Sequence, residues 1–319
     1  MNNQEKINFR QSRDFGETFN VSIKFFRQNF KLFFQSLIFI AGPFILISAI
    51  AGAFYQSNAV SIFSMAQKGE SDIFSQFGWT YLIFILAAIL ANIILIGTVF
   101  SFMINYMERG PGGFTVNNVS RILFKNMRNI LAVFFILMFL TIIVLAAIVG
   151  IVFAISSVVP VLGILLGIAL FFGFLILFPP LMWQLSVVYL VKMQEGKSVF
   201  ESFGRTRKVM RDNFWWTWVI MVCAVFAVGI ISFVFALPQA VYQIVLMFSH
   251  FKDNSGEPSI PFLIVATVCT FCTTLLYSGL YVISAFHYYS LAEQKDGIGL
   301  MERIDEIGNT PANNVEQQY

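Results

Sequence analysis

The chain has 319 residues, of which 58% are hydrophobic and 12% charged, and its formal net charge is +3. With a mean hydropathy of +0.77 it is too apolar for a water-soluble globular domain of this length. The composition therefore excludes a soluble enzyme or binding module and predicts an integral membrane protein.

Charged residues separate six uncharged runs, and each run is long enough to cross a hydrocarbon layer of ~30 Å. We expect an all-α polytopic bundle of six transmembrane helices, at roughly 32–55, 79–107, 129–155, 160–191, 213–248 and 261–290. Gly42–Pro43, Pro179–Pro180 and Pro238 predict kinks or breaks in three of these helices.

Basic residues lie almost entirely on one side of the predicted spans. Of the 20 Lys and Arg residues, all except Lys68 and Lys252 fall in the N-terminal segment, in the 108–128 and 192–212 connections, or in the C-terminal segment. Because basic loops stay in the cytoplasm, this predicts a multi-pass protein of the bacterial inner membrane with both termini cytoplasmic. No secretory signal peptide is expected, because the N-terminal residues lack a short apolar run with a cleavage site.

Each odd-numbered span follows a segment with an apolar stripe beside a basic stripe at helical spacing. Such helices are typical of the membrane interface, where basic side chains attract anionic head groups. The alternative is that the charges only set topology. The predicted anionic-lipid contacts are Lys24, Arg27, Lys31, Arg121, Lys125, Arg128, Arg205, Lys208 and Arg211.

The pattern predicts one membrane domain over 1–308, with a pseudo-threefold repeat of a basic interfacial helix and a two-span hairpin. The expected repeats cover about 13–110, 114–197 and 198–297. An acidic helix at about 298–308 leads into no span, and we expect it to pack on the basic helices or on a partner. Residues 309–319 have the composition of a disordered tail.

The stretch from Glu195 to Trp215 reads E-G-K-S-V-F-E-S-F, followed by basic residues and Asn-Phe-Trp. With the six-span layout, it resembles the membrane domain found beside glycerophosphoryl diester phosphodiesterases and related bacterial membrane domains of unknown function. In those proteins the phosphodiesterase carboxylates and histidines lie in a separate soluble domain. The resemblance therefore implies a membrane role and carries over no catalytic residue.

The predicted spans contain no Asp, Glu, Lys or Arg, which argues against proton-coupled transport and against intramembrane catalysis. The three cysteines lie in apolar runs, and His250 and His287 are far apart, so we expect no metal and no cofactor. His287 is the one candidate relay residue in a span. Three separate interfacial helices would not form a nucleic-acid groove, so no nucleic-acid partner is expected.

Uncharged polar residues recur every three or four positions along the sixth span, and others lie in the second, fourth and fifth spans. We expect them either to line a cavity or to hydrogen-bond between helices. The predicted cavity residues are Asn92, Gln184, Gln239, Gln243, Thr267, Thr270, Thr274 and Tyr281.

Two functions fit these patterns. The first is a non-enzymatic scaffold or accessory subunit that contacts anionic lipid and a cytoplasmic or membrane protein partner. The second is a transporter or lipid-handling protein for an uncharged or amphipathic substrate, which would use the polar face of the sixth span.

Overall fold

The computed structural model describes residues 5–67, 73–250, 260–297 and 299–301. Over these residues the chain is all-helical, without a strand, as the sequence predicts. Within these described ranges, six helical segments are long and apolar enough to cross a membrane, so the protein is a multi-pass membrane protein. The elements are α1 (Phe15–Ser36), η1 (Leu37–Ala41), α2 (Gly42–Gln67), α3 (Ile73–Arg109), α4 (Val116–Val158), α5 (Pro160–Glu195), α6 (Val199–Met210), η2 (Arg211–Asn213), α7 (Phe214–His250), α8 (Ile260–Leu276) and α9 (Ser278–Asp296).

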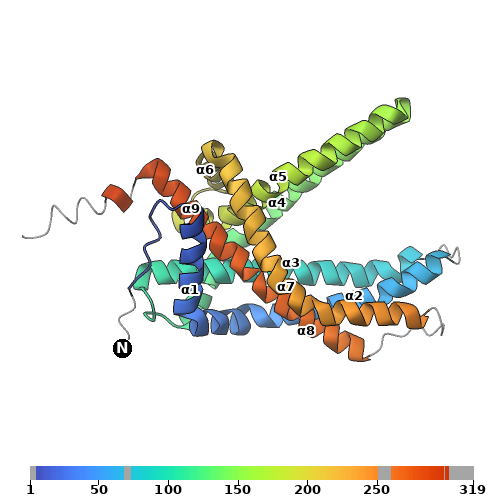
Figure 1. Ribbon diagram of the computed structural model, residues 1–319, viewed down its shortest axis with the longest axis horizontal. Helices are drawn as coiled ribbons and strands as arrows, with labels where there is room; N and C mark the ends of the chain where they lie inside the picture. Colours follow the sequence, from blue (N-terminus) through green and yellow to red (C-terminus); the bar gives the residue numbers. More distant parts are fainter. Residues whose placement is uncertain (1–4, 68–72, 251–259, 298, 302–319) are drawn as a thin grey trace, which may run out of the picture.

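The elements that carry the basic segments gather at one end of the molecule. Helix α1, helix α6 and the C-terminal end of α9 lie together there, while the α4–α5 turn at Val159 lies far from them (Figure 1). We call this end the basic end. The arrangement is the one that alternating basic connections predict.

The first basic helix and the first span meet at a sharp turn of the chain. Helix α1 lies across the direction of α2, and the π-helical turn Leu37–Ala41 joins them (Figure 1). Helix α1 begins at a capping box in which Asp14 accepts from the Glu17 backbone at 2.7 Å and the Glu17 carboxylate accepts from Asp14 N at 3.1 Å. The turn therefore lies inside the predicted first span, 32–55, and α2 follows it.

The other two junctions are built differently. Helix α4 runs without interruption from its basic first turns into the apolar segment, whereas α6 reaches α7 through the short 3₁₀ turn Arg211–Asn213. At ~1.5 Å per residue α4 extends roughly 64 Å, about twice the thickness of the hydrocarbon layer, so it must tilt or continue beyond that layer. The threefold repeat stays a prediction.

Of the three predicted sites, Gly42–Pro43 directly follows the π-helical turn Leu37–Ala41, whereas the other two show no break in secondary structure. Helix α5 continues through Pro179 and Pro180, and α7 continues through Pro238. The sixth predicted span is interrupted instead, at Tyr277, where α8 ends and α9 begins. A transmembrane helix tolerates proline when neighbouring groups compensate the lost hydrogen bond, which explains why α5 and α7 continue through their prolines.

Helix α2 packs between α3 and α8, and α7 packs on α8. The α4–α5 hairpin projects away from these four helices toward its turn (Figure 1). Its buried side chains lie near the basic end, and Phe139 and Phe153 farther along it are exposed. Exposed apolar side chains are expected where the solvent is lipid.

The core is densest at the basic end, where the N-terminal segment folds back over the helices. Phe9 is buried against the rings of Phe25, Tyr106, Phe286 and Tyr289 at centroid distances of 6.2, 5.7, 4.7 and 5.4 Å. Aromatic pairs at such distances contribute beyond their buried area. The segment is therefore part of the fold.

Polar contacts fix the same segment. Ile7 N donates to the Tyr106 hydroxyl at 3.1 Å, and Arg13 N donates to Ser290 Oγ at 2.8 Å. The Lys6 ammonium donates to the carbonyl of Met107 at 2.6 Å. These bonds connect the N-terminal segment to α3 and α9, which are distant in sequence.

Candidate functional site

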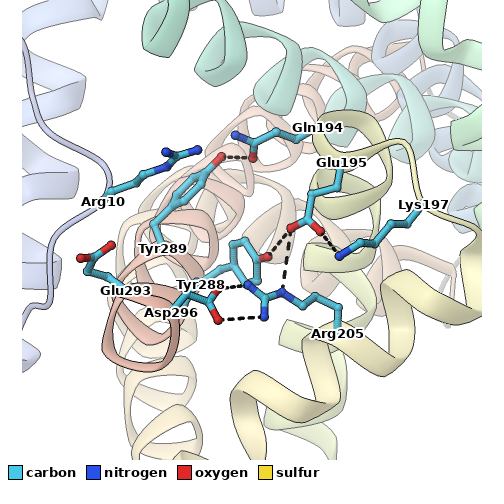
Figure 2. A pocket seen from close by; sticks show the side chains of 10 residues that line it. Arg10, Gln194, Glu195, Lys197, Arg205, Tyr288, Tyr289, Glu293 and Asp296 are labelled. Carbon is cyan, nitrogen blue, oxygen red and sulfur yellow. Dashed lines mark hydrogen bonds and ion pairs between the residues drawn. The ribbon is translucent and has the colours of Figure 1, made fainter. Parts of the chain in front are cut away.

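A pocket of about 450 Å³ opens at the basic end where α5, α6 and α9 meet. We call it the α5–α6–α9 pocket (Figure 2). Its lining includes the start of the motif at Glu195, the middle of α6, the last turns of α9, and Arg10 from the N-terminal segment. The lining residues are Arg10, Gln194, Glu195, Lys197, Arg205, Tyr288, Tyr289, Ala292, Glu293 and Asp296.

Local sequence explains why the chain turns into this pocket. Helix α5 ends at Gly196, whose φ of 65° is the left-handed conformation that glycine adopts without strain. Two residues later Ser198 caps α6, with its Oγ accepting from Glu201 N at 3.2 Å and the Glu201 carboxylate accepting from Ser198 N at 2.9 Å. The sequence E-G-K-S-V-F-E is thus a helix stop followed directly by a helix start.

Arg205 is the centre of the charged contacts. Its guanidinium donates one hydrogen bond to Asp296 Oδ1 at 3.2 Å and another to Asp296 Oδ2 (Figure 2). Its Nε lies 4.0 Å from Glu195 Oε1. The Arg205 and Asp296 side chains are only 19% and 25% exposed. A two-pronged pair of this kind fixes geometry as well as charge, so it holds α6 against α9.

Two tyrosines of α9 complete the wall. The Tyr288 hydroxyl donates to Glu195 Oε1 at 3.1 Å, and the Tyr289 hydroxyl donates to Gln194 Oε1 at 2.7 Å. Lys197 lies 2.5 Å from Glu195 Oε2. The end of α5 is therefore tied to α9 and to the first residues before α6.

The ion pairs shift the titration of groups that lie outside the uncharged runs. The hydrogen bond from Arg205 holds the pKa of Asp296 below its ordinary value, and the same bond raises the pKa of Arg205. The hydrogen bond from Lys295, whose Nζ lies 2.8 Å from Asp212 Oδ2, lowers the pKa of Asp212. Both acids are therefore ionised at neutral pH and stay paired.

The pocket carries three cationic and three anionic side chains, so it presents no net field that would select one sign of ligand. Glu293 accepts from the backbone N–H groups of Gly299 and Leu300 at 2.8 and 2.9 Å. Among the residues that the structure describes, no three His, Cys, Asp or Glu side chains gather as metal ligands would. The paired charges of this pocket therefore join α5, α6 and α9 to one another.

The structure separates Arg205 from the other predicted lipid contacts. Those eight side chains are exposed, on α1, α4, α6 and η2: Lys24, Arg27, Lys31, Arg121, Lys125, Arg128, Lys208 and Arg211. Beside them Phe30 on α1 and Phe124 on α4 are each 61% exposed. Exposed basic and exposed aromatic side chains thus occur together on the same helix surfaces.

The predicted cavity residues do not come together in one place. Asn92 and Tyr281 line a common groove, whereas Gln184 donates to the carbonyl of Phe203 at 3.4 Å. Gln239 and Gln243 both donate to Gln56 Oε1, the latter at 2.8 Å. On α8, Thr274 donates to the carbonyl of Thr270 at 2.8 Å, and Thr267 is partly buried.

His287, the candidate relay residue, lies inside the bundle. It is buried, its Nε2 is 3.0 Å from Thr217 Oγ1, and its ring centroid is 5.4 Å from that of Trp183. Trp183 Nε1 donates to the carbonyl of Ser284 at 3.1 Å. This polar contact joins α5, α7 and α9, which gives His287 a packing role.

Sequence reasoning missed Asp296, Gln194 and the N-terminal segment as site residues. Ile7 and Phe9 alternate with polar residues before the capping Asp14, which is the signal that could have marked a packed segment. Asp296 gave no comparable signal, because its partner Arg205 lies 91 residues away.

Comparison with known protein families, with curated proteins and with solved structures finds no match to this chain.

Proposed function

We propose that this chain is a non-enzymatic scaffold or accessory subunit of the bacterial inner membrane that engages anionic lipid at its basic end, with that end and both termini in the cytoplasm. The observation that supports the proposal is the pairing of exposed cations with exposed aromatic rings on α1 and α4, as at Phe30 beside Lys31 and Phe124 beside Lys125. Rings sink among acyl chains while neighbouring cations meet phosphates, and each cation near an anionic surface adds about 1 kcal/mol.

The cytoplasmic orientation is supported by the positive-inside rule applied to the basic end. A membrane role with no catalysis is also what the resemblance to phosphodiesterase-associated membrane domains implies, and that resemblance stays a hypothesis. The protein partner is a prediction from the acidic segment 298–308, of which only 299–301 lie among the described residues.

The experiment is lipid selection. Protein reconstituted into vesicles with equal amounts of phosphatidylglycerol and phosphatidylcholine is extracted in mild detergent. Native mass spectrometry then identifies the bound lipids and gives the ratio of the two. We expect phosphatidylglycerol to be enriched on the wild type and the enrichment to fall in a Lys24→Gln, Arg27→Gln, Lys31→Gln variant.

The matched control is Lys24→Arg with Lys31→Arg, which keeps the charge on α1 and should keep the enrichment. A wild type without preference for phosphatidylglycerol, or a glutamine variant that selects it as well as the wild type does, would overturn the proposal.

A second candidate function is lipid handling, and a groove of about 940 Å³ among the spans favours it. Of the eight predicted cavity residues, only Asn92 and Tyr281 line this groove, and most of its other lining side chains are apolar. Its walls therefore suit an amphipathic substrate better than a polar one.

A further inference from the structure

Helices α3, α4, α5, α7 and α9 surround a groove of about 940 Å³ that is separate from the α5–α6–α9 pocket. We call it the lateral groove. It exists because the α4–α5 hairpin contacts the other helices near the basic end and diverges from them beyond it (Figure 1). A space of this size is in the range of small-molecule sites, about 300–1,000 Å³.

Most of the lining is apolar. Phe84, Ile85 and Ala88 come from α3, with Met182 from α5 and Val222 from α7. Because these side chains lie within segments long and apolar enough to span a membrane, the medium around the groove is acyl chains. A polar solute would lose its water here without gaining enough partners.

Polarity along the groove is uneven. Helices α5 and α9 run toward the basic end, so Tyr189 and Ser284 lie nearer that end than Phe178 does. Helix α7 runs away from it, which places Phe226 deeper than Met221. Apart from the Tyr277 ring at the deep end, the few polar side chains of the lining lie toward the basic end, among apolar ones such as Ile96, and the deeper lining is apolar.

Tyr189 points to the kind of ligand. The side chain is only 9% exposed and lines the groove. Within the described part of the chain its hydroxyl makes no hydrogen bond, and the same holds for Tyr281, which lines the groove on α9. Neither hydroxyl is among the polar atoms that the described residues enclose without a partner, so both remain open to the groove. A hydroxyl that faces an apolar medium without a partner is costly, so an acceptor from a ligand would stabilise it.

We propose that the lateral groove holds one acyl chain of a phospholipid from the leaflet at the basic end. The ester carbonyl of that chain accepts a hydrogen bond from Tyr189, and its methylenes lie along Met182 and Val222 toward Phe84 and Phe226. The inference deepens the second candidate function, lipid handling, and rests on it. It does not depend on the lipid contacts of α1 and α4.

The test uses phosphatidylglycerol and phosphatidylcholine that each carry a diazirine on one acyl chain. The full-length protein in nanodiscs containing either probe is irradiated after exchange into mild detergent has removed loosely held lipid, and adducts are mapped by mass spectrometry. We expect adducts at Ala88, Met182 and Val222 to exceed those at the lipid-exposed Phe139 and Phe153.

Two variants test the geometry. Ala88→Trp fills the groove and should remove its adducts, while the same change at the exposed Ala147 on α4 should leave them in place. Tyr189→Phe removes only the hydroxyl and should lower the yield of groove adducts roughly fivefold, the loss expected for one hydrogen bond of about 1 kcal/mol. Tyr189→Phe also keeps the test decisive should Ala88→Trp fail to fold.

Equal adduct yields at groove and exposed positions, or groove adducts that survive both Ala88→Trp and Tyr189→Phe, would overturn the inference. Comparing the two lipid probes, which differ in head group, distinguishes failure of this inference from failure of the lipid-selection proposal. Groove adducts should form with both probes, whereas selection at α1 concerns phosphatidylglycerol alone and should be unchanged in Ala88→Trp.

Discussion

Replacing Arg205 with glutamine should destabilise the fold without changing lipid selection. The guanidinium makes two charge-assisted bonds to Asp296 and lies 4.0 Å from Glu195. Without it, the Glu195 and Asp296 carboxylates would lose the cation that lies between them. Lys197, 2.5 Å from Glu195, would offset only part of this loss, because Lys197 and Lys208 lower the pKa of Asp296 less than the Arg205 hydrogen bond does.

The magnitude follows from burial. Removing one partner of a fully buried pair costs about 3–5 kcal/mol. The Arg205 and Asp296 side chains are 19% and 25% exposed, so solvent screens part of the loss, and we expect a cost of about 2 kcal/mol. Arg207→Gln is the matched control on the same helix, because Arg207 is exposed and its loss should cost less than about 0.5 kcal/mol.

The assay is unfolding by SDS in dodecylmaltoside micelles, followed by circular dichroism, for the single variants and for Arg205→Gln with Asp296→Asn. The double variant removes the unpaired charge, so it should be more stable than the sum of the single losses implies, by about 1 kcal/mol or more. Equal stabilities of Arg205→Gln and Arg207→Gln, or strictly additive losses in the double variant, would refute this reasoning.

Three further predictions follow from the described contacts. Phe9→Ala should cost about 3 kcal/mol in the same SDS assay, because it opens a cavity among four aromatic rings; a loss below about 1 kcal/mol would show that the N-terminal segment is not part of the core. Trp183→Phe should cost about 2 kcal/mol, since the buried Ser284 carbonyl loses its donor; full stability would contradict the bond. Asp296 has a lowered pKa, so its pairing with Arg205 stabilises the protein above the ordinary value of 3.8 and is lost as pH falls through the lowered pKa; the stability difference between wild type and Asp296→Asn should therefore shrink below about pH 4, and a difference that grew there would reverse the sign of this linkage.

The number and order of membrane-crossing segments could be predicted from sequence because hydrocarbon thickness sets the length of every uncharged run. The charge pattern likewise predicted that the basic segments share one end. Helix interruptions could not be read in this way. The π-helical turn Leu37–Ala41 directly precedes Gly42–Pro43, but Pro179, Pro180 and Pro238 interrupt no helix. Tyr277, where α8 gives way to α9, lies in a run without a charge or a proline beside it.

The candidate site was predictable in part. The basic spacing on α6 looked like that on α1 and α4, so Arg205 was grouped with exposed cations. Its actual partner, Asp296, is 91 residues away, and helical periodicity within one segment says nothing of such distant contacts. The polar set failed to gather for a similar reason: residues on one face of a helix meet different neighbours along its length, as Gln243 meets Gln56 while Tyr281 meets the lateral groove.

The measurement that tests the central claim most directly is side-specific labelling. Single cysteines replace Lys24, Arg121 or Arg207 in a variant without native cysteines, and a membrane-impermeant maleimide is applied to right-side-out and inverted vesicles. The account predicts that all three positions, exposed on α1, α4 and α6, react in inverted vesicles only. Labelling of any one of them from the opposite face would contradict a single basic end, and with it the lipid contacts proposed there.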